Sequence, residues 1–278
     1  MRKLILTFLI LLTFGDAICQ IESFYLGENI KDKILFRKIK EIKGEMYKCA
    51  NEMPEKTGRI VFYYSYDQNG NLKMKQQYSL RKEKITASYE YFYNREGVLN
   101  EDIEYDVSGR IALKCKYKYD ASGRLIERTK YKQNGKESTT ILYRYNDRNL
   151  LESEEWYNKK GNVYEEKKFE YDENGNLVDE THYNNEAAVI THYAFRYNER
   201  NLLAEKINYY ANGGVYERWV YEYDINGNRI QENHFFSSEK PEYTLDYIYD
   251  EYYNIREMKY YIESGKLNKV FKYIYEYY

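Results

Sequence analysis

Aromatic and polar residues alternate along most of this chain. Phe169 and Tyr171 flank Glu170, and the same order of aromatic, polar and aromatic residue recurs from the first third of the sequence to its end. Because successive side chains of a β-strand point to opposite faces of the sheet, this alternation predicts strands of about seven to nine residues with one aromatic and one polar face.

Turn signals separate the alternating segments. Residues 171–177, for example, read Tyr-Asp-Glu-Asn-Gly-Asn-Leu. Asp at the first turn position and Gly at the fourth are typical of a type I turn followed by a left-handed residue, which closes a three-residue hairpin loop with a bulge. In such a hairpin Tyr171 faces Leu177. The sequence therefore predicts β-hairpins in which the aromatic and aliphatic residues share one face.

The turn marker returns at a fixed interval. Tyr-Asp or Tyr-Asn begins at residues 66, 93, 119, 145, 171, 197, 223 and 249, at first 27 and then 26 residues apart. A second turn lies halfway along each unit, and residues 38–49 and 59–66 add one degenerate hairpin. A period of this size predicts a repeat protein. We expect an all-β fold, an antiparallel meander of about 18 strands from 26-residue hairpin repeats, which forms a twisted or spiralling open sheet.

Three segments are expected along the chain. Residues 1–19 have a basic start, an apolar run too short to span a bilayer and a small-residue cleavage site, and they predict a signal peptide. The alternative is a lipoprotein with Cys19 acylated, the only case in which we expect attachment to a membrane. Residues 20–59 form an N-terminal segment with the degenerate first strand, and residues 60–278 form the repeat domain. Either route exports the chain to the periplasm, the outer surface or the medium.

Residues 117–125 read Tyr-Lys-Tyr-Asp-Ala-Ser-Gly-Arg-Leu. They resemble the YD repeat of the RHS family, whose motif runs Tyr-x-Tyr-Asp-x-x-Gly-Arg-Leu. The resemblance covers roughly residues 60–278 and implies hairpins that spiral into a continuous sheet. Large members of the family enclose a C-terminal toxin, whereas others are extracytoplasmic surface proteins often described as carbohydrate-binding. Because the chain ends at Tyr278 inside a repeat, and about eight units are too few to enclose a cargo domain, we expect a short secreted member without a toxin domain.

Composition narrows the function classes. The chain has 43 basic and 45 acidic residues, a balance that argues against nucleic acid as a partner. No grouping of residues suggests catalysis, so we expect no enzyme activity, no cofactor and no metal site. Among the three histidines, His182 and His192 flank one turn at equal distances, so we expect a solvated pair facing each other on the polar face.

The aromatic face carries the candidate ligand-binding residues. When the alternation of faces is counted through the turns, the acids two residues after each aliphatic turn residue lie beside the tyrosine rings. Trp219 lies on the same face and Trp156 on the opposite one. Such a row suits sugar binding, but the acids can equally accept hydrogen bonds from tyrosine hydroxyls and hold the ladder together, and this structural role is favoured. The candidate residues are Tyr119, Tyr145, Tyr171, Tyr193, Trp219, Glu127, Asp179 and Glu205.

Two functions follow from these patterns. The first is a non-enzymatic extracytoplasmic repeat protein that binds a surface ligand, such as a carbohydrate or a surface protein, through its Tyr-rich face. The alternative is a structural or protein–protein interaction module, a shell or scaffold, whose aromatic face is only its core. The sequence leaves the oligomeric state open. Solvent exposure of the aromatic face would favour the first function, and a closed face the second.

Overall fold

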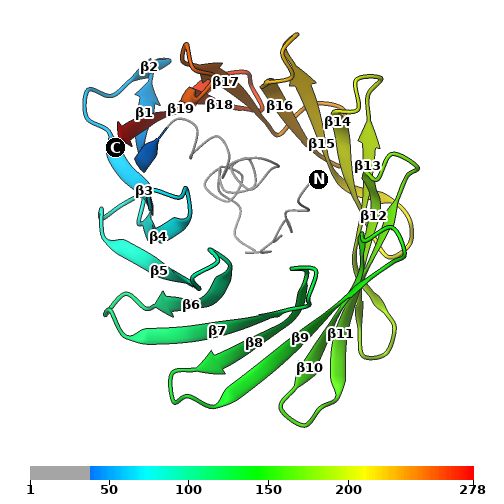
Figure 1. The fold of residues 1–278 in the computed structure, drawn as a ribbon. Helices are drawn as coiled ribbons and strands as arrows, with labels where there is room; N and C mark the ends of the chain where they lie inside the picture. Colours follow the sequence, from blue (N-terminus) through cyan, green and yellow to red (C-terminus); the bar gives the residue numbers. More distant parts are fainter. Residues whose placement is uncertain (1–37) are drawn as a thin grey trace. The chain divides into compact units, whose positions relative to one another are not determined.

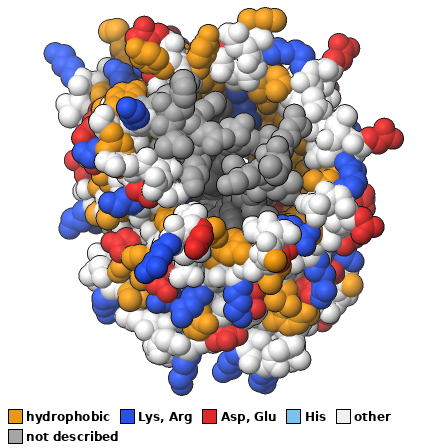
Figure 2. Space-filling view, in the orientation of Figure 1, with side chains coloured by type: hydrophobic (Ala, Val, Ile, Leu, Met, Phe, Trp, Pro, Cys, Tyr) orange, Lys and Arg blue, Asp and Glu red, His pale blue; other side chains and the backbone are white. Residues whose placement is uncertain are grey.

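A computed structural model describes residues 38–278, which form β-strands joined by short turns (Figure 1). The predicted signal peptide, the alternatives for Cys19 and the first part of the N-terminal segment lie outside the described residues. No helix within residues 38–278 is long and apolar enough to cross a membrane. Basic, acidic and hydrophobic side chains are interspersed over the face shown in Figure 2.

The described residues confirm the all-β prediction. They form a 19-stranded sheet. Wherever the register between two strands is known, the strands run antiparallel. One strand has only two residues, so the count agrees with the expected 18 or so hairpin strands. The strands are β1 (Ile39–Ala50), β2 (Met53–Pro54), β3 (Arg59–Tyr66), β4 (Leu72–Tyr78), β5 (Ile85–Tyr93), β6 (Leu99–Tyr105), β7 (Ile111–Tyr119), β8 (Leu125–Lys132), β9 (Glu137–Tyr145), β10 (Leu151–Asn158), β11 (Val163–Tyr171), β12 (Leu177–Asn184), β13 (Val189–Tyr197), β14 (Leu203–Tyr209), β15 (Val215–Tyr223), β16 (Arg229–Phe236), β17 (Tyr243–Tyr249), β18 (Ile255–Ile262) and β19 (Leu267–Tyr277).

The hairpin turns have the predicted geometry. Between β11 and β12, the Asp172 N–H donates to the Asn176 carbonyl at 2.9 Å, and the Gly175 N–H donates to the Asp172 carbonyl at 3.1 Å. Gly175 has a φ of 87°, the left-handed conformation that closes the bulged turn. Asn149 takes the same place in another turn with a φ of 60°, as the tolerance of Asn for this conformation predicts.

A second irregularity follows each of these turns. Tyr171 pairs with Leu177 as expected, but Glu170 then pairs with Asp179, so Val178 has no partner on β11. The pairs on either side of the β13–β14 turn show the same shift. An extra residue on one strand moves every later side chain to the opposite face. Parity counted from the turn is therefore inverted along the second strand of each hairpin.

The described residues divide into two compact units. The first contains residues 38–48, 55–114 and 271–278. Within it, β1 pairs with β3 and also with β19. The Tyr278 N–H donates to the Lys38 carbonyl at 2.8 Å, and Lys40 forms a 2.6 Å ion pair with Glu276. The expectation of an open sheet is wrong here, because the first and last strands of the meander are bonded to each other.

An apolar core fills the first unit. Ile42, Val61, Phe62 and Phe271 are each 1% exposed or less. Gly44 is required beneath Phe62, because a Cβ atom at Gly44 would lie 2.0 Å from the Phe62 ring. These side chains pack hydrocarbon against hydrocarbon.

The second unit contains residues 49–54 and 115–270. Its strands from β8 to β18 pair in sequence order through hairpins. Apolar residues such as Leu245 and Met258 are buried, but so are Lys167, Glu180 and Glu232. The corresponding positions of the first unit, Lys75 and Asp102, are also charged but only half-buried.

Candidate functional site

The aromatic face of the second unit is defined by the residues that share a side with Phe169 and Tyr171. Residues directly opposite each other on paired strands point to the same face, so the register carries this face from β8 to β17. It includes Arg128, Lys130, Thr139, Ile141, Tyr143, Glu154, Trp156, Glu165, Lys167, Phe169, Glu180, His182, Thr191, Tyr193, Phe195, Lys206, Asn208, Glu217, Trp219, Tyr221, Glu232, His234, Phe236, Tyr243 and Leu245.

The three predicted acids do not lie on this face. Glu127 is paired with Leu142 rather than with Ile141, and it forms an ion pair with the exposed Lys118 at 2.8 Å. Asp179 and Glu205 likewise occupy the polar face, where Asp179 contacts His192 and Glu205 forms ion pairs with Arg196 and Arg218. The predicted placement is wrong because of the bulge after each turn. After the bulge, the residue three places beyond the aliphatic turn residue lies on the aromatic face, where the prediction had the residue two places beyond. After Leu177 these are Glu180 and Asp179.

The predicted tyrosines lie where the sequence placed them, but the hydroxyls of two of them, Tyr145 and Tyr171, bond to backbone. The Tyr145 hydroxyl donates to the Leu125 carbonyl and the Tyr171 hydroxyl to the Leu151 carbonyl, both at 2.8 Å. Desolvation raises the pKa of Tyr119, Tyr145 and Tyr171 to about 12. The same bond recurs at Tyr93, Tyr197, Tyr223 and Tyr249. In each case the tyrosine hydroxyl donates to the backbone carbonyl of the first strand residue after the preceding Tyr-Asp or Tyr-Asn turn. We call this series the tyrosine ladder.

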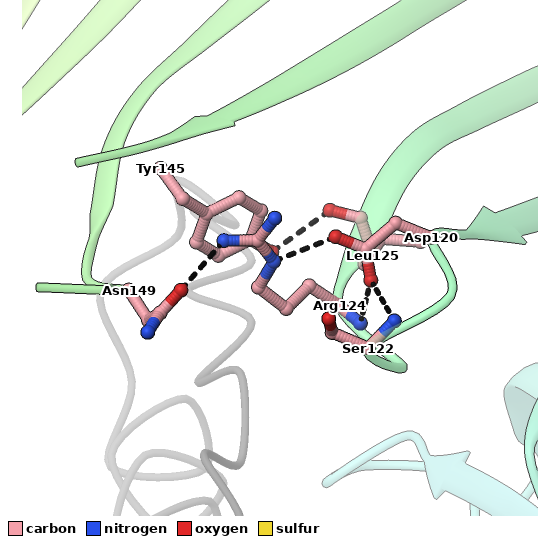
Figure 3. A network of polar contacts seen from close by, with 6 residues as sticks. All are labelled: Asp120, Ser122, Arg124, Leu125, Tyr145 and Asn149. Atoms are coloured by element: carbon pink, nitrogen blue, oxygen red, sulfur yellow. Dashed lines mark hydrogen bonds and ion pairs between the residues drawn. The ribbon is translucent and has the colours of Figure 1, made fainter. Parts of the chain in front are cut away.

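Turn side chains reinforce the ladder (Figure 3). Asp120 Oδ1 accepts hydrogen bonds from the backbone N–H groups of Ser122 and Arg124, and Oδ2 accepts one from the Arg124 guanidinium at 2.6 Å. These bonds hold the pKa of Asp120 below its ordinary value, and the bond from the Arg124 backbone contributes most. The guanidinium also donates to Asn149 Oδ1 at 2.8 Å and lies 5.0 Å from the centre of the Tyr145 ring. One turn is thereby tied to the next.

Residues 145–151 and 197–203 are near copies 52 residues apart, and one pattern of arginine hydrogen bonds recurs in both. Arg148 donates to the carbonyls of Asp172 and Glu173, and Arg200 donates in the same way to those of Asp224 and Ile225. In each block the arginine of one turn caps the exposed carbonyls of the next. The two-unit block is therefore a structural unit as well as a sequence unit.

Charged residues on the aromatic face were missed by sequence reasoning. Lys167 donates to Glu180 at 3.0 Å, with side chains 7% and 2% exposed. Desolvation raises the pKa of Glu154 to about 7, raises that of Glu232 and lowers that of Lys206. Burying charge is costly unless it is paired. The inverted parity assigns Glu154, Glu180, Lys206 and Glu232 to the polar face. Lys167 lies two residues before Phe169, so its place on the aromatic face could have been found from the alternation alone.

The aromatic rings of the face are distributed differently from the prediction. Trp219 lies on it as predicted, opposite Lys206 and His234. Trp156 was expected on the polar face but lies on the aromatic face, with its ring 5.6 Å from that of His182. The same bulge that moved the acids explains this error.

The histidines do not form the expected pair. His182 is opposite Thr191, whereas His192 is opposite Thr181, so the two imidazoles lie on different faces of the sheet. No group of three or more His, Cys, Asp or Glu side chains is arranged to hold a metal ion in residues 38–278.

His234 is at the centre of the most elaborate cluster on the face. Its ring lies 5.0 Å from that of Trp219 and 4.7 Å from that of Tyr243. Its Nε2 is 3.1 Å from Glu217 Oε2, and Asn208 Nδ2 donates to Glu217 Oε1 at 3.0 Å. A carboxylate therefore joins an amide to an imidazole that contacts two aromatic rings.

No family model and no curated protein matches the chain. Solved structures with related geometry include the crystal structure of TcdB2-TccC3-Cdc42, with 14% identity and a TM-score of 0.39 over 78% of this chain and 13% of that one. The Photorhabdus luminescens Tc holotoxin pore gives the same values. A porin-like protein from Bacteroides uniformis has 11% identity and a TM-score of 0.48 over 86% of this chain and 98% of that one. The chain thus spans a small part of the Tc proteins and nearly the whole of the porin-like protein.

Proposed function

We propose that this chain is a short extracytoplasmic protein of the RHS/YD-repeat type without enzyme activity, in which the tyrosine ladder builds the sheet and the aromatic face of the second unit binds a surface ligand. The observation that carries the proposal is the row of charged side chains on that face. The export and the family are supported by residues 1–19 and by the motif that recurs in register.

The charged row is difficult to explain as core packing. Replacing a buried ion pair with apolar residues of similar volume is often neutral or stabilising. The chain can also bury an apolar core, since Ile42, Val61 and Phe62 of the degenerate hairpin are almost fully enclosed. Charges that folding does not require are therefore assigned to recognition.

Carbohydrate is the ligand class that this chemistry favours. A sugar ring has an apolar face that packs on an aromatic ring, and hydroxyls that bond to carboxylates and amides. Both partners lie close together here, since Trp219 is directly opposite Lys206 and His234, and Asn208 is opposite Glu217.

A glycan array probed with the full chain tests this function. We expect a restricted set of glycans to be retained and the signal to fall in Lys206→Met, since Lys206 lies 4.9 Å from the Trp219 ring centre and 4.1 Å from that of Tyr193. The matched control is Arg196→Met on the polar face, whose side chain is 64% exposed. An array without a specific signal, or one that Lys206→Met leaves unchanged, contradicts the proposal.

A second candidate function is a structural or protein-interaction module. The bonds from Tyr145 and Tyr171 to backbone carbonyls favour it, because those hydroxyls are occupied by the fold itself. Since β1 pairs with β19, a protein partner would use the polar face rather than a terminal strand. Capture of a defined surface protein that is lost on reversing charges at Arg144 and Arg196, together with a blank glycan array, would establish this function instead.

A further inference from the structure

A run of aromatic side chains leads from an exposed turn to His234. Tyr210 is 47% exposed, and its ring meets that of Tyr216 at 4.9 Å. Tyr216 in turn meets Phe236 at 4.6 Å, and Phe236, itself 41% exposed, lies 6.2 Å from His234. The run thus passes from two exposed rings to an imidazole that is 7% exposed.

The turn does not need the aromatic ring at Tyr210. The Tyr210 N–H donates to the Gly214 carbonyl and the Gly213 N–H donates to the Tyr210 carbonyl, the same two bonds that Asn184 makes in the preceding unit. Corresponding turns have Asp106, Lys132 and Asn158 in this place. An exposed aromatic residue that replaces a polar turn residue, and that meets the first of two further aromatic rings edge to face, is typical of a binding surface.

His234 ends the run with an unused hydrogen-bonding atom. Because the Glu217 carboxylate can only accept, the Nε2 facing it carries a proton, and in this tautomer Nδ1 is an acceptor. Nδ1 is buried and has no hydrogen-bond partner among residues 38–278. An unpaired buried acceptor is unfavourable, because it has lost its hydrogen bonds to water and gained none in the protein. A hydroxyl donor from a ligand would remove that cost.

Glu217 offers a second acceptor beside the first. Burial favours its neutral form, but hydrogen bonds from His234 and Asn208 outweigh burial and hold the pKa of Glu217 below its ordinary value. The carboxylate is therefore ionised at neutral pH. Its side chain is 16% exposed, so it is accessible to a ligand. Two neighbouring acceptors against aromatic rings call for a ligand with several hydroxyl donors and an apolar ring face.

We infer that the second unit has a pyranose-binding site in which His234 Nδ1 and the Glu217 carboxylate accept hydroxyls of one sugar ring. Phe236, Tyr216 and Tyr210 bind the next sugar rings of the same oligosaccharide. This site rests on the proposed function, and it narrows the ligand to a neutral oligosaccharide. Trp219 and Tyr243 hold the imidazole from its two sides.

Tryptophan fluorescence and calorimetry test the site. The chain has two tryptophans, so Trp156→Phe leaves Trp219 as the single reporter. We expect neutral trisaccharides of glucose, mannose, galactose or N-acetylglucosamine to change its emission. Phe236→Ala and Tyr210→Ala should each weaken binding about three- to tenfold, and His234→Phe, which keeps a ring but removes the acceptor, about tenfold.

Tyr252→Ala is the matched control, because Tyr252 is 60% exposed and lies in a turn outside the run. It should bind like the parent chain, and thermal unfolding checks that each variant is folded. If array glycans still bind His234→Phe and Phe236→Ala with parental affinity, the site is wrong while the proposed function stands. If no trisaccharide binds the parent chain, or if a peptide competes for the same Trp219 signal, the pyranose site is overturned.

Discussion

The two units share their turns and their ladder but differ in what they bury. The Tyr93 hydroxyl bonds to the Leu72 carbonyl at 2.9 Å in the first unit, and the Tyr171 hydroxyl bonds to the Leu151 carbonyl at 2.8 Å in the second. Beneath this common frame the first unit buries hydrocarbon such as Phe62, whereas the second buries Lys167 and Glu180.

This difference separates the residues that specify the fold from those that are free to change. Turn residues and ladder tyrosines must be kept, because each fixes a backbone conformation or a bond between hairpins. Strand positions between the turns fix neither a turn conformation nor a bond between hairpins. Both units have charged residues there, but Lys75 and Asp102 in the first unit are only half-buried, whereas Glu180 and Glu232 in the second are buried. We therefore expect ligand specificity to depend on strand positions of the second unit rather than on the repeat motif.

The largest expected effect comes from breaking the buried ion pair. Lys167→Met leaves Glu180, which is 1% exposed, without its cation, and should cost about 3–5 kcal/mol of unfolding free energy. The double variant Lys167→Met/Glu180→Leu should recover most of this loss. In the first unit, Ile42→Val should cost only about 0.5–1.5 kcal/mol.

Urea unfolding of the second unit can be followed by tryptophan emission, because Trp156 and Trp219 both belong to it. A Lys167→Met variant as stable as the parent chain would show that the pair is not a buried charge pair, and the contrast between the units would then disappear.

The next effect is a dependence of stability on pH. Desolvation raises the pKa of Glu154 from 4.5 to about 7. The folded chain therefore holds this proton more tightly than the unfolded chain does. The resulting stability is fully present below about pH 4.5 and is lost as the pH rises through 7, by on the order of 2–3 kcal/mol.

Urea midpoints measured between pH 5 and pH 8 check this prediction. Glu154→Gln, which cannot ionise, should flatten the part of the profile that is due to Glu154. Glu155→Gln is a suitable control, since Glu155 lies on the polar face and its pKa is lowered, chiefly by hydrogen bonding to Arg144. Parallel profiles for the parent chain and Glu154→Gln would contradict the assignment.

Local chemistry explains how much of this could be predicted. The turn at Asp172 and Gly175 follows from the conformational preferences of those residues, and the sequence shows it at every repeat. Val178 carries no comparable mark, because a strand bulge is decided by backbone pairing rather than by the residue itself. Because of the bulge, Asp179 lies on the polar face and Glu180 on the aromatic face, so the sequence misplaced the acids. The fold class depends on the turns and was predicted correctly.

Pairing between distant segments was also beyond the sequence. Lys38 and Tyr278 are bonded, yet they stand at opposite ends of the described chain, and no local period indicates that β1 and β19 meet. Nor could the unused acceptor of His234 be found, since it depends on the side chains that three neighbouring strands bring to it.

The smallest effect is the most direct test of what the units have in common. Tyr93→Phe in the first unit and Tyr171→Phe in the second each remove one hydroxyl and leave one backbone carbonyl without its donor, so each should cost about 1 kcal/mol. Tyr252→Phe, at a 60% exposed side chain, should cost almost nothing. Equal losses at Tyr93 and Tyr171 in urea unfolding would show that the ladder is indifferent to the residues buried beneath it. A loss confined to one unit would mean that the ladder and the buried face are coupled, because the same bond would then depend on whether hydrocarbon or charge lies beside it.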